Sequence, residues 1–189
     1  IQYLLGQKCS IVICSHLGRP EGKVNADFSL ALVAKELSKL LEVKVDFADD
    51  CVSDKTIEKA QSLKPGQILL VENLRFYAQE EENEKDFADK LSQLGEVFVQ
   101  DGFGVVHRAH ASTEGVTKFL PSVAGLLLSR EVDTISGVME NPKKPLMAII
   151  GGAKISDKIE IINRMIDIAD IVAIGGAMAN TFLLAENIN

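Results

Sequence analysis

The sequence predicts an α/β protein built on a parallel sheet that helices cover on both faces. Short apolar runs of strand-forming residues alternate along the chain with longer segments whose apolar residues recur at helical spacing. The first pattern is typical of buried parallel strands, and the second of amphipathic helices. Regular alternation of the two indicates strands joined by crossover helices.

Six apolar runs are predicted to be strands. Each contains four to six residues, which is too short for a helix of ordinary length. In chain order, the runs are Cys9–Cys14, Val43–Phe47, Ile68–Val71, Glu96–Val99, Leu146–Ile150 and Ile171–Ile174.

Five segments between these runs are predicted to be helices. In the first, one helical face carries Leu30, Val33, Ala34, Leu37, Leu40 and Leu41. The other helical segments are Asp54–Leu63, Glu82–Leu94, Ser122–Met139 and Ser156–Ile168. The acidic run from Glu80 to Asp89 is interpreted as a solvated helix with acids favourably placed at its N-terminus.

A domain boundary is predicted at Asn141–Pro145, where two prolines and two lysines favour a stiff, exposed connection. Residues 1–121 then form a first domain, and 122–141 an interdomain helix and hinge. Residues 142–189 begin a second domain that is too short for an independent core. The chain opens without Met or a signal pattern, so we expect a segment of a longer protein.

The charge balance excludes broad electrostatic binding of nucleic acid or an anionic membrane. Twenty Lys and Arg against twenty-seven Asp and Glu give a net charge of −7, so any anion site must be local. No apolar run reaches the roughly 18 residues of a membrane span, and we expect a cytoplasmic protein. The three cysteines are expected to be buried small residues of a reducing compartment.

Basic side chains gather just after the first, third and fourth predicted strands. Open parallel sheets bind ligands outside the carboxyl ends of their strands, so these segments are expected to meet at one edge. They contain all three His and three of the five Arg, namely His16, Arg19, Arg75, His107, Arg108 and His110. Arg binds carboxylate or phosphate bidentately, and His adds a donor that titrates near neutral pH. The combination favours a small polyanion as the ligand.

Two other interpretations of these residues stay open. Each Arg can pair with an acidic neighbour such as Glu72 or Asp101, which would make the residues structural. His107 and His110 can share one side of a helical turn, with His16 as a third zinc ligand, although the nearby arginines would repel a cation. Gly102-x-Gly104-x-x-His107 resembles a dinucleotide fingerprint without its third Gly, which leaves a nicotinamide oxidoreductase as a weaker alternative.

Paired glycines follow the last two predicted strands. They are Gly151-Gly152 and Gly175-Gly176, and the first pair is followed by Ala153, Lys154 and Lys158. Glycine turns let a ligand approach the backbone, and a following helix N-terminus attracts phosphate. If the helix starts early enough, both lysines reach the same side. The glycines can equally serve tight turns alone.

Five motifs resemble those of the phosphoglycerate kinase family, in the same order along nearly the whole chain. They are SHLGRP (Ser15–Pro20), ENLRF (Glu72–Phe76), DGFGVVHRAHAST (Asp101–Thr113), GGAKISDK (Gly151–Lys158) and IGGAMANTF (Ile174–Phe182). The resemblance implies two Rossmann-like domains joined by a helical hinge. It also implies reversible phosphoryl transfer in glycolysis, from 1,3-bisphosphoglycerate to ADP, giving 3-phosphoglycerate and ATP.

Matching the motifs residue by residue implies roles on both sides of the reaction. The implied phosphoglycerate contacts are His16, Leu17, Gly18, Arg19, Arg75, His107 and Arg108. The implied nucleotide contacts are Gly152, Ala153, Lys154, Lys158, Gly175 and Gly176. Lys154 and Arg108 are the implied catalytic residues, because they bring positive charge to the transferring group.

The family pattern also implies what this chain lacks. The sequence does not contain the family's opening strand with its Asp-Phe-Asn motif. It also lacks the Gly-Gly-Asp-Thr loop, which in the family holds the Mg²⁺ that accompanies ATP or ADP, so no metal ligand is expected here. Gly102 and Ala177 stand where the family usually has Ala and Gly. The full-length form is expected to be monomeric, and residues 1–189 alone to be inactive. A non-catalytic phosphate-binding module is the alternative from another functional class.

Overall fold

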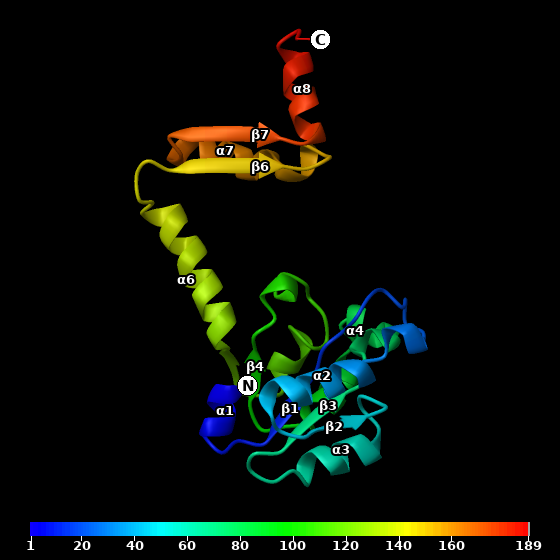
Figure 1. The fold of residues 1–189 in the computed structure, drawn as a ribbon. Helices are drawn as coiled ribbons and strands as arrows, with labels where there is room; N and C mark the ends of the chain where they lie inside the picture. Colours follow the sequence, from blue (N-terminus) through cyan, green and yellow to red (C-terminus); the bar gives the residue numbers. More distant parts are fainter. Residues whose placement is uncertain (189) are drawn as a thin grey trace. The chain divides into compact units, whose positions relative to one another are not determined.

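The structure, a computed structural model, describes residues 1–188 apart from the side chain of Asp157. The chain divides into two compact units, one spanning Ile1–Leu128 and the other beginning at Ser129. Every strand pair in the described part is parallel, and helices lie between successive strands (Figure 1). The predicted α/β class is therefore confirmed.

The first unit is built on a sheet of three strands in the order β1-β3-β2. These strands are β1 (Ile11–Ile13), β2 (Val45–Ala48) and β3 (Ile68–Val71). The central strand β3 pairs through Ile68 with Ile11 on one side and with Val45 on the other. All four residues of β3 are buried, as expected for a run of Ile, Leu and Val in the middle of a parallel sheet.

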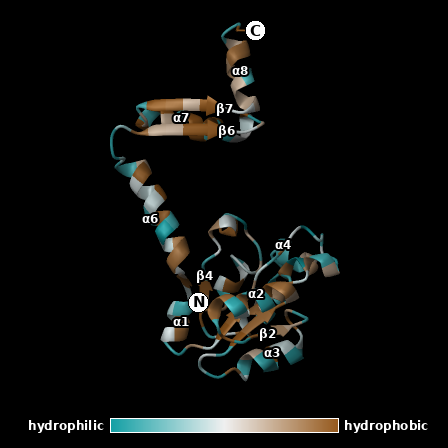
Figure 2. Cartoon of the chain, in the orientation of Figure 1, coloured by the Kyte–Doolittle hydropathy of each residue, from teal (hydrophilic) through white to brown (hydrophobic). Residues whose placement is uncertain are grey.

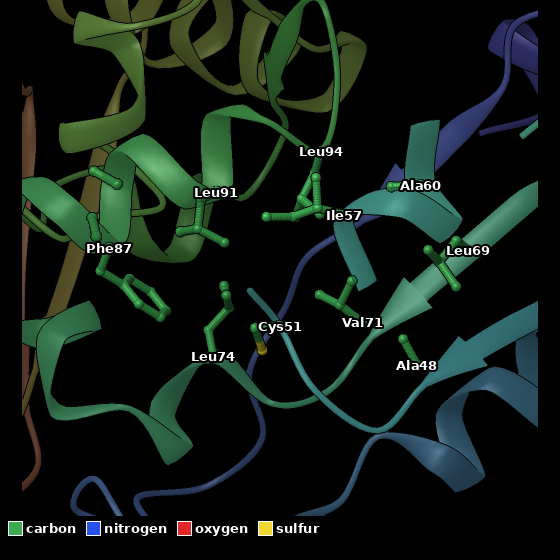
Figure 3. Packing of buried hydrophobic residues seen from close by; sticks show 12 residues of the cluster. Ala48, Cys51, Ile57, Ala60, Leu69, Val71, Leu74, Phe87, Leu91 and Leu94 are labelled. Atoms are coloured by element: carbon green, nitrogen blue, oxygen red, sulfur yellow. The ribbon is translucent and has the colours of Figure 1, made fainter. Parts of the chain in front are cut away.

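Alternate residues of β3 supply two separate cores, because successive side chains on a strand point to opposite faces. Ile68 and Leu70 pack with Ala34 of helix α2 (Ala31–Leu41). Leu69 and Val71 pack on the other face with helices α3 (Asp54–Gln61) and α5 (Lys85–Ser92), as Figure 3 shows. Helices thus cover both faces of this sheet, as the sequence predicted.

Shorter elements complete the first unit and carry most of its loops. A second pair of parallel strands, β4 (Phe98–Gln100) and β5 (Ser122–Ala124), aligns Val99 with Val123. The remaining elements are α1 (Gln2–Gly6), η1 (Ala26–Phe28), η2 (Leu74–Phe76), α4 (Ala78–Glu81), η3 (Phe103–Val105) and η4 (Gly115–Lys118).

Strand β5 corrects the predicted interdomain helix, which was expected to begin at Ser122. The helix, α6, runs from Leu126 to Glu140, and Ser122–Ala124 pairs instead with β4. The N–H of Gly125 donates to the carbonyl of Gln100 at 2.7 Å, so the bonding to β4 continues up to the helix start. Tertiary pairing overrides the apolar helical pattern in these three residues.

The acidic run is also different from its prediction. It forms two helices, α4 and α5, and the second begins at Lys85 rather than at Glu82. Asn83 lies between them with a φ of 55°, which a continuous helix does not allow. Glu80 is only 3% exposed, so the run is not a uniformly solvated face.

The second unit contains a two-stranded parallel sheet of β6 (Met147–Gly151) and β7 (Ile171–Gly175). Its other elements are η5 (Ser156–Lys158), α7 (Ile159–Ile168) and α8 (Ala177–Ala185). Both strands carry hydrophobic residues (Figure 2), and Ile149 is 77% exposed. No helix in the described part of the chain is long and apolar enough to cross a membrane.

The cysteines follow their prediction only in part. Cys51 is fully buried, whereas Cys9 is half-buried and Cys14 is exposed. Although Cys14 is exposed as a residue, burial of its thiol and the charge of Glu80 together raise the pKa of this thiol to about 12. Burial also raises the pKa of the Cys51 thiol. Thiols that stay protonated at neutral pH are poor nucleophiles, so Cys14 and Cys51 are inert.

Candidate functional site

The loops after β1 and β3 lie side by side at the carboxyl end of the sheet, because the two strands are neighbours. The N–H of Leu74 donates to the carbonyl of Ser15 at 3.1 Å. The fully buried amide of Asn73 donates through Nδ2 to the carbonyls of Leu17 and Phe28, at 2.8 and 2.9 Å. One side chain on the β3 loop therefore fixes the backbone of the loop that carries His16 and Arg19.

Gly18 is required by the shape of this loop. Its φ is +67°, and a Cβ at this position would lie 2.6 Å from the ring of Phe28. The Gly18 carbonyl accepts a hydrogen bond from Nη1 of Arg75 at 3.0 Å. Any larger residue at position 18 would strain the backbone and displace the Phe28 ring. The strained backbone would also shift the carbonyl that Arg75 contacts.

The acidic residues that the sequence offered as partners for the arginines are engaged elsewhere. Glu72 is buried, and its Oε1 accepts from the N–H of Leu30 at 2.8 Å, where α2 begins. Asp101 Oδ1 accepts from the N–H groups of Leu127 and Leu128, at 2.8 and 3.0 Å, in the first turn of α6. Both carboxylates therefore serve helix N-termini, and neither pairs with an arginine.

The three predicted arginines have different environments. Arg75 is 6% exposed, and its Nε lies 3.5 Å from Oε1 of Glu81. Arg19 and Arg108 are exposed, and neither forms an ion pair with any acidic side chain that the structure describes. The salt-bridge interpretation therefore holds for Arg75 alone, and two guanidinium groups are available to an anion.

Electrostatics identify which bases lie together. Partial burial lowers the pKa of His16, and the charges of Arg75, Arg108 and His110 lower it further, against a smaller opposing effect of Glu81. His16, Arg75, Arg108 and His110 are called the basic cluster below. It brings together the segments that follow β1, β3 and β4.

His110 is the member of the basic cluster that the motif comparison did not single out. Its side chain is 12% exposed, and its Nδ1 lies 3.6 Å from Oε1 of Glu80. His107, which was expected in the site, is exposed and is not among the groups that act on His16. The sequence held no signal that separates the two histidines, because residues three apart can lie on the same side of a helical turn. In the described part, no group of three His, Cys, Asp or Glu is placed to hold a metal ion.

The predicted nucleotide residues lie at the carboxyl ends of β6 and β7. Gly151 and Gly175 are register partners at the strand ends. A Cβ on Gly176, whose φ is +68°, would lie 3.3 Å from the carbonyl oxygen of Gly152, which also accepts from the N–H of Met178 at 3.0 Å. The glycine pairs thus let two strand-to-helix turns approach each other closely.

The two lysines are arranged differently from the expectation. Helix α7 begins at Ile159, so Lys154 precedes it and the argument from four-residue helical spacing does not apply. Lys158 is half-buried, with its Cε 3.0 Å from the position a Cβ on Gly152 would take. Lys154 and Ala153 are exposed. The Lys158 stem therefore packs on the glycine turn, while Lys154 projects from the loop.

Comparison with known proteins places this arrangement in a family. A family model described as phosphoglycerate kinase matches residues 1–189. The chain belongs to the phosphoglycerate kinase family. The phosphoglycerate kinase of Moorella thermoacetica is 49% identical over 186 residues, which cover 98% of this chain and 47% of the relative. That of Desulforudis audaxviator is 49% identical over 189 residues, covering 100% of this chain and 48% of the relative.

Solved phosphoglycerate kinases share the fold. The structure from Coxiella burnetii has a TM-score of 0.83 at 44% identity, covering 98% of this chain and 46% of that protein. The structure from Pyrococcus horikoshii has a TM-score of 0.88 at 31% identity, covering 100% of this chain and 48% of that protein. The chain spans about half the length of the phosphoglycerate kinases it matches.

Proposed function

We propose that this chain is the part of a phosphoglycerate kinase that binds 3-phosphoglycerate and begins the nucleotide site. The observation that carries the proposal is the basic cluster, with the unpaired guanidinium groups of Arg19 and Arg108, in a chain of net charge −7. Positive charge gathered at the carboxyl ends of parallel strands favours a small polyanion such as a phosphorylated carboxylate.

On the phosphoglycerate side, Arg19 and Arg108 are proposed to bind the anionic groups directly. His16 adds a donor within the basic cluster, and His107 contributes from the same exposed loop. The N–H groups of Leu17 and Gly18 donate to no group in the described part of the chain, which leaves them for an anion. The buried Arg75 contributes charge and holds the Gly18 carbonyl in place.

On the nucleotide side, the glycine turns are proposed to receive the phosphates of ATP or ADP. Gly152, Ala153, Gly175 and Gly176 provide close backbone approach, and Lys158 lies against this turn. The exposed Lys154 is proposed to neutralise charge on the transferring phosphoryl group. Mg²⁺ accompanies the nucleotide, and its family ligand is expected outside this segment.

The reaction proposed is direct phosphoryl transfer with no covalent enzyme intermediate. In the direction of ATP synthesis, a β-phosphate oxygen of ADP forms a bond to phosphorus, and the bond from phosphorus to the acyl oxygen breaks. The carboxylate of 3-phosphoglycerate leaves with the electron pair. The protein supplies position and positive charge, chiefly from Arg108 and Lys154, around the oxygens of the transferring group.

The proposed domain division keeps a phosphoglycerate domain, an interdomain helix and a truncated nucleotide domain. Because β5 pairs with β4, residues 122–124 are assigned to the first domain rather than to the hinge. The full-length form is proposed to be a cytoplasmic monomer.

The proposal is tested by calorimetric binding of 3-phosphoglycerate to a full-length phosphoglycerate kinase that carries this segment. Arg108→Ala should weaken binding by about 1.5–3 kcal/mol, because one charge-assisted contact is lost. Arg164→Ala, an exposed arginine on α7, is the matched control and should leave the affinity unchanged. An unchanged affinity for Arg108→Ala would remove this residue from the site.

A second arm of the same test distinguishes an enzyme from a binding module. Lys154→Ala should lower kcat more than it weakens nucleotide binding, if its contact strengthens as the phosphoryl group transfers. A full-length protein that binds 3-phosphoglycerate but shows no turnover before any substitution would be a phosphate-binding module instead.

A further inference from the structure

Helix α4 presents two neighbouring carboxylates to the two segments that carry Arg75 and Arg108. It follows directly after the turn that contains Arg75. Glu81 faces the Nε of Arg75 at 3.5 Å, while Glu80 turns inward and is only 3% exposed. No role in substrate binding follows for Glu80 from the motifs or from the proposed reaction.

Glu80 holds three consecutive residues of the loop after β4. Its Oε1 accepts from the hydroxyl of Ser112 at 2.6 Å, and its Oε2 accepts from the N–H of Ser112 at 3.0 Å. Its backbone carbonyl accepts from the N–H of Ala111 at 2.9 Å. His110 Nδ1 lies 3.6 Å from Oε1. Both the backbone and the side chain of one residue therefore anchor this loop.

The anchored residues in turn fix the backbone of Arg108. The N–H of His110 donates to the Arg108 carbonyl at 3.0 Å, and the N–H of Arg108 donates to the carbonyl of Val105 at 2.9 Å. Ala111 is fully buried in the core that α5 shares with β3. Arg108 thus lies in a short, bonded stretch between η3 and the Glu80 anchor, while its own side chain is exposed.

Burying a carboxylate costs free energy that packing alone does not offset. An ionisable group loses its hydration there, and it is tolerated only when hydrogen bonds and charges replace the water. Glu80 meets the hydroxyl and N–H of Ser112, and the charges of His110 and Arg75 act on it as well. These are residues of the basic cluster or of its loop, so the carboxylate is placed to orient that loop.

We propose that Glu80 is the positioning residue for Arg108, and that it sets the affinity for the anionic substrate without touching it. The anchor on Ser112 and Ala111 fixes the backbone from which the Arg108 side chain reaches the ligand. Removal of the Glu80 carboxylate releases Ser112, while Ala111 stays bonded to the Glu80 backbone carbonyl. The loop is then held less firmly, so that Arg108 must be ordered when substrate binds. The inference rests on the proposed function in that 3-phosphoglycerate is taken as the anion.

The test uses a full-length phosphoglycerate kinase that carries this segment, with Glu80→Ala, Glu80→Gln and the exposed neighbour Glu82→Ala as the matched control. Glu80→Ala should raise the KM for 3-phosphoglycerate about tenfold, with the KM for ATP unchanged. Glu80→Gln should restore part of the loss, since its carbonyl oxygen still accepts from the Ser112 N–H. Glu82→Ala should change neither constant.

The decisive readout is a double-mutant cycle with Arg108→Ala. If Glu80 acts through Arg108, Glu80→Ala should change the KM for 3-phosphoglycerate less than about twofold once Arg108 has been removed. An equal fold-change in both backgrounds would overturn the inference. So would a Glu80→Ala variant with wild-type KM values and only a lower melting temperature.

Two further variants keep the outcomes distinguishable. Where Glu80→Ala fails to fold, Ser112→Ala takes its place, because it removes only the 2.6 Å hydrogen bond from the Ser112 hydroxyl to Glu80. Ser112→Ala should raise the KM for 3-phosphoglycerate by a smaller factor than Glu80→Ala. An unchanged KM for 3-phosphoglycerate overturns the inference. If Arg108→Ala by itself leaves 3-phosphoglycerate affinity unchanged, the proposed function fails. If Arg108→Ala weakens binding while the Glu80 variants do not, only the positioning role fails.

Discussion

At the scale of single residues, His16 is the group whose charge depends most directly on the basic cluster. Burial and the neighbouring positive charges lower its pKa from 6.5, so it is neutral in the folded protein near neutral pH. In the unfolded chain it is protonated as the pH falls through about 6.5. The unfolded state then binds more protons, so His16 makes the free protein lose stability as the pH drops below that value.

Substrate binding should reverse this shift, because an anion beside His16 favours its charged form. At pH 6, binding of 3-phosphoglycerate to the full-length enzyme should take up more protons in the wild type than in His16→Gln. The measurement is calorimetry in buffers of different ionisation enthalpy. Subtracting the variant removes the titration of the ligand phosphate itself. Equal proton uptake in both proteins would separate His16 from the bound anion.

At the scale of elements, the start of α6 depends on Asp101, a residue that follows β4. Its Oδ1 accepts from the N–H groups of Leu127 and Leu128, two donors that the helix cannot satisfy by itself. Gly125 lies against this carboxylate so closely that a Cβ there would collide with it. The segment that leads to Arg108 and the helix that leads out of the first unit are therefore bonded through one side chain.

Asp101→Ala should lower the free energy of unfolding by about 1 kcal/mol, the usual effect of losing a helix cap. Asp101→Asn should cost less, because the amide oxygen still accepts one hydrogen bond. Urea unfolding of the full-length protein measures both. Asp133→Ala, an exposed site on α6 itself, is the control and should stay near wild type. A loss as large at Asp133 as at Asp101 would contradict the capping role.

At the scale of the whole molecule, the second unit leaves apolar residues of its sheet uncovered. Its sheet has two strands in the described part, and Met147, Ile149 and Ile171 are each more than half exposed. The chain covers 47–48% of the phosphoglycerate kinases to which it is about 49% identical. Apolar surfaces exposed to this degree are typical of sites that another surface covers.

Residues 1–189 by themselves should therefore show no detectable kinase activity. Holding both substrates in line can contribute roughly 7–11 kcal/mol to lowering the barrier, and the part of the proposed nucleotide site that this chain carries does not supply this. A coupled assay on the purified chain, with an intact phosphoglycerate kinase as the positive control, is the measurement. Turnover of the chain near that of the control would show that the residues present suffice.

The sequence by itself determined the fold class, the location of six of the seven strands in the described part and the segments that bear the basic cluster. Strand β3 occupies Ile68–Val71, as predicted, because a run of Ile, Leu and Val has one low-energy place, the centre of a parallel sheet. His16 and Arg75 could be grouped in advance because they follow neighbouring strands of one parallel sheet, whose carboxyl ends meet at one edge. Arg108 follows β4, which pairs with β5 in a separate sheet, so the same rule does not explain its place beside them. Both inferences use local pattern together with a general rule of topology.

Only the tertiary structure decided which partner each polar side chain has. Glu72 and Asp101 cap helices rather than pair with arginines, and Glu80 leaves an acidic surface run to anchor Ser112, 32 residues away. Ser122–Ala124 became a strand because β4 supplied backbone partners. Hydrogen bonds form between groups that are close in space. A carboxylate can accept hydrogen bonds from a helix N-terminus, a hydroxyl or a guanidinium, and the sequence does not show which of these the fold brings within reach.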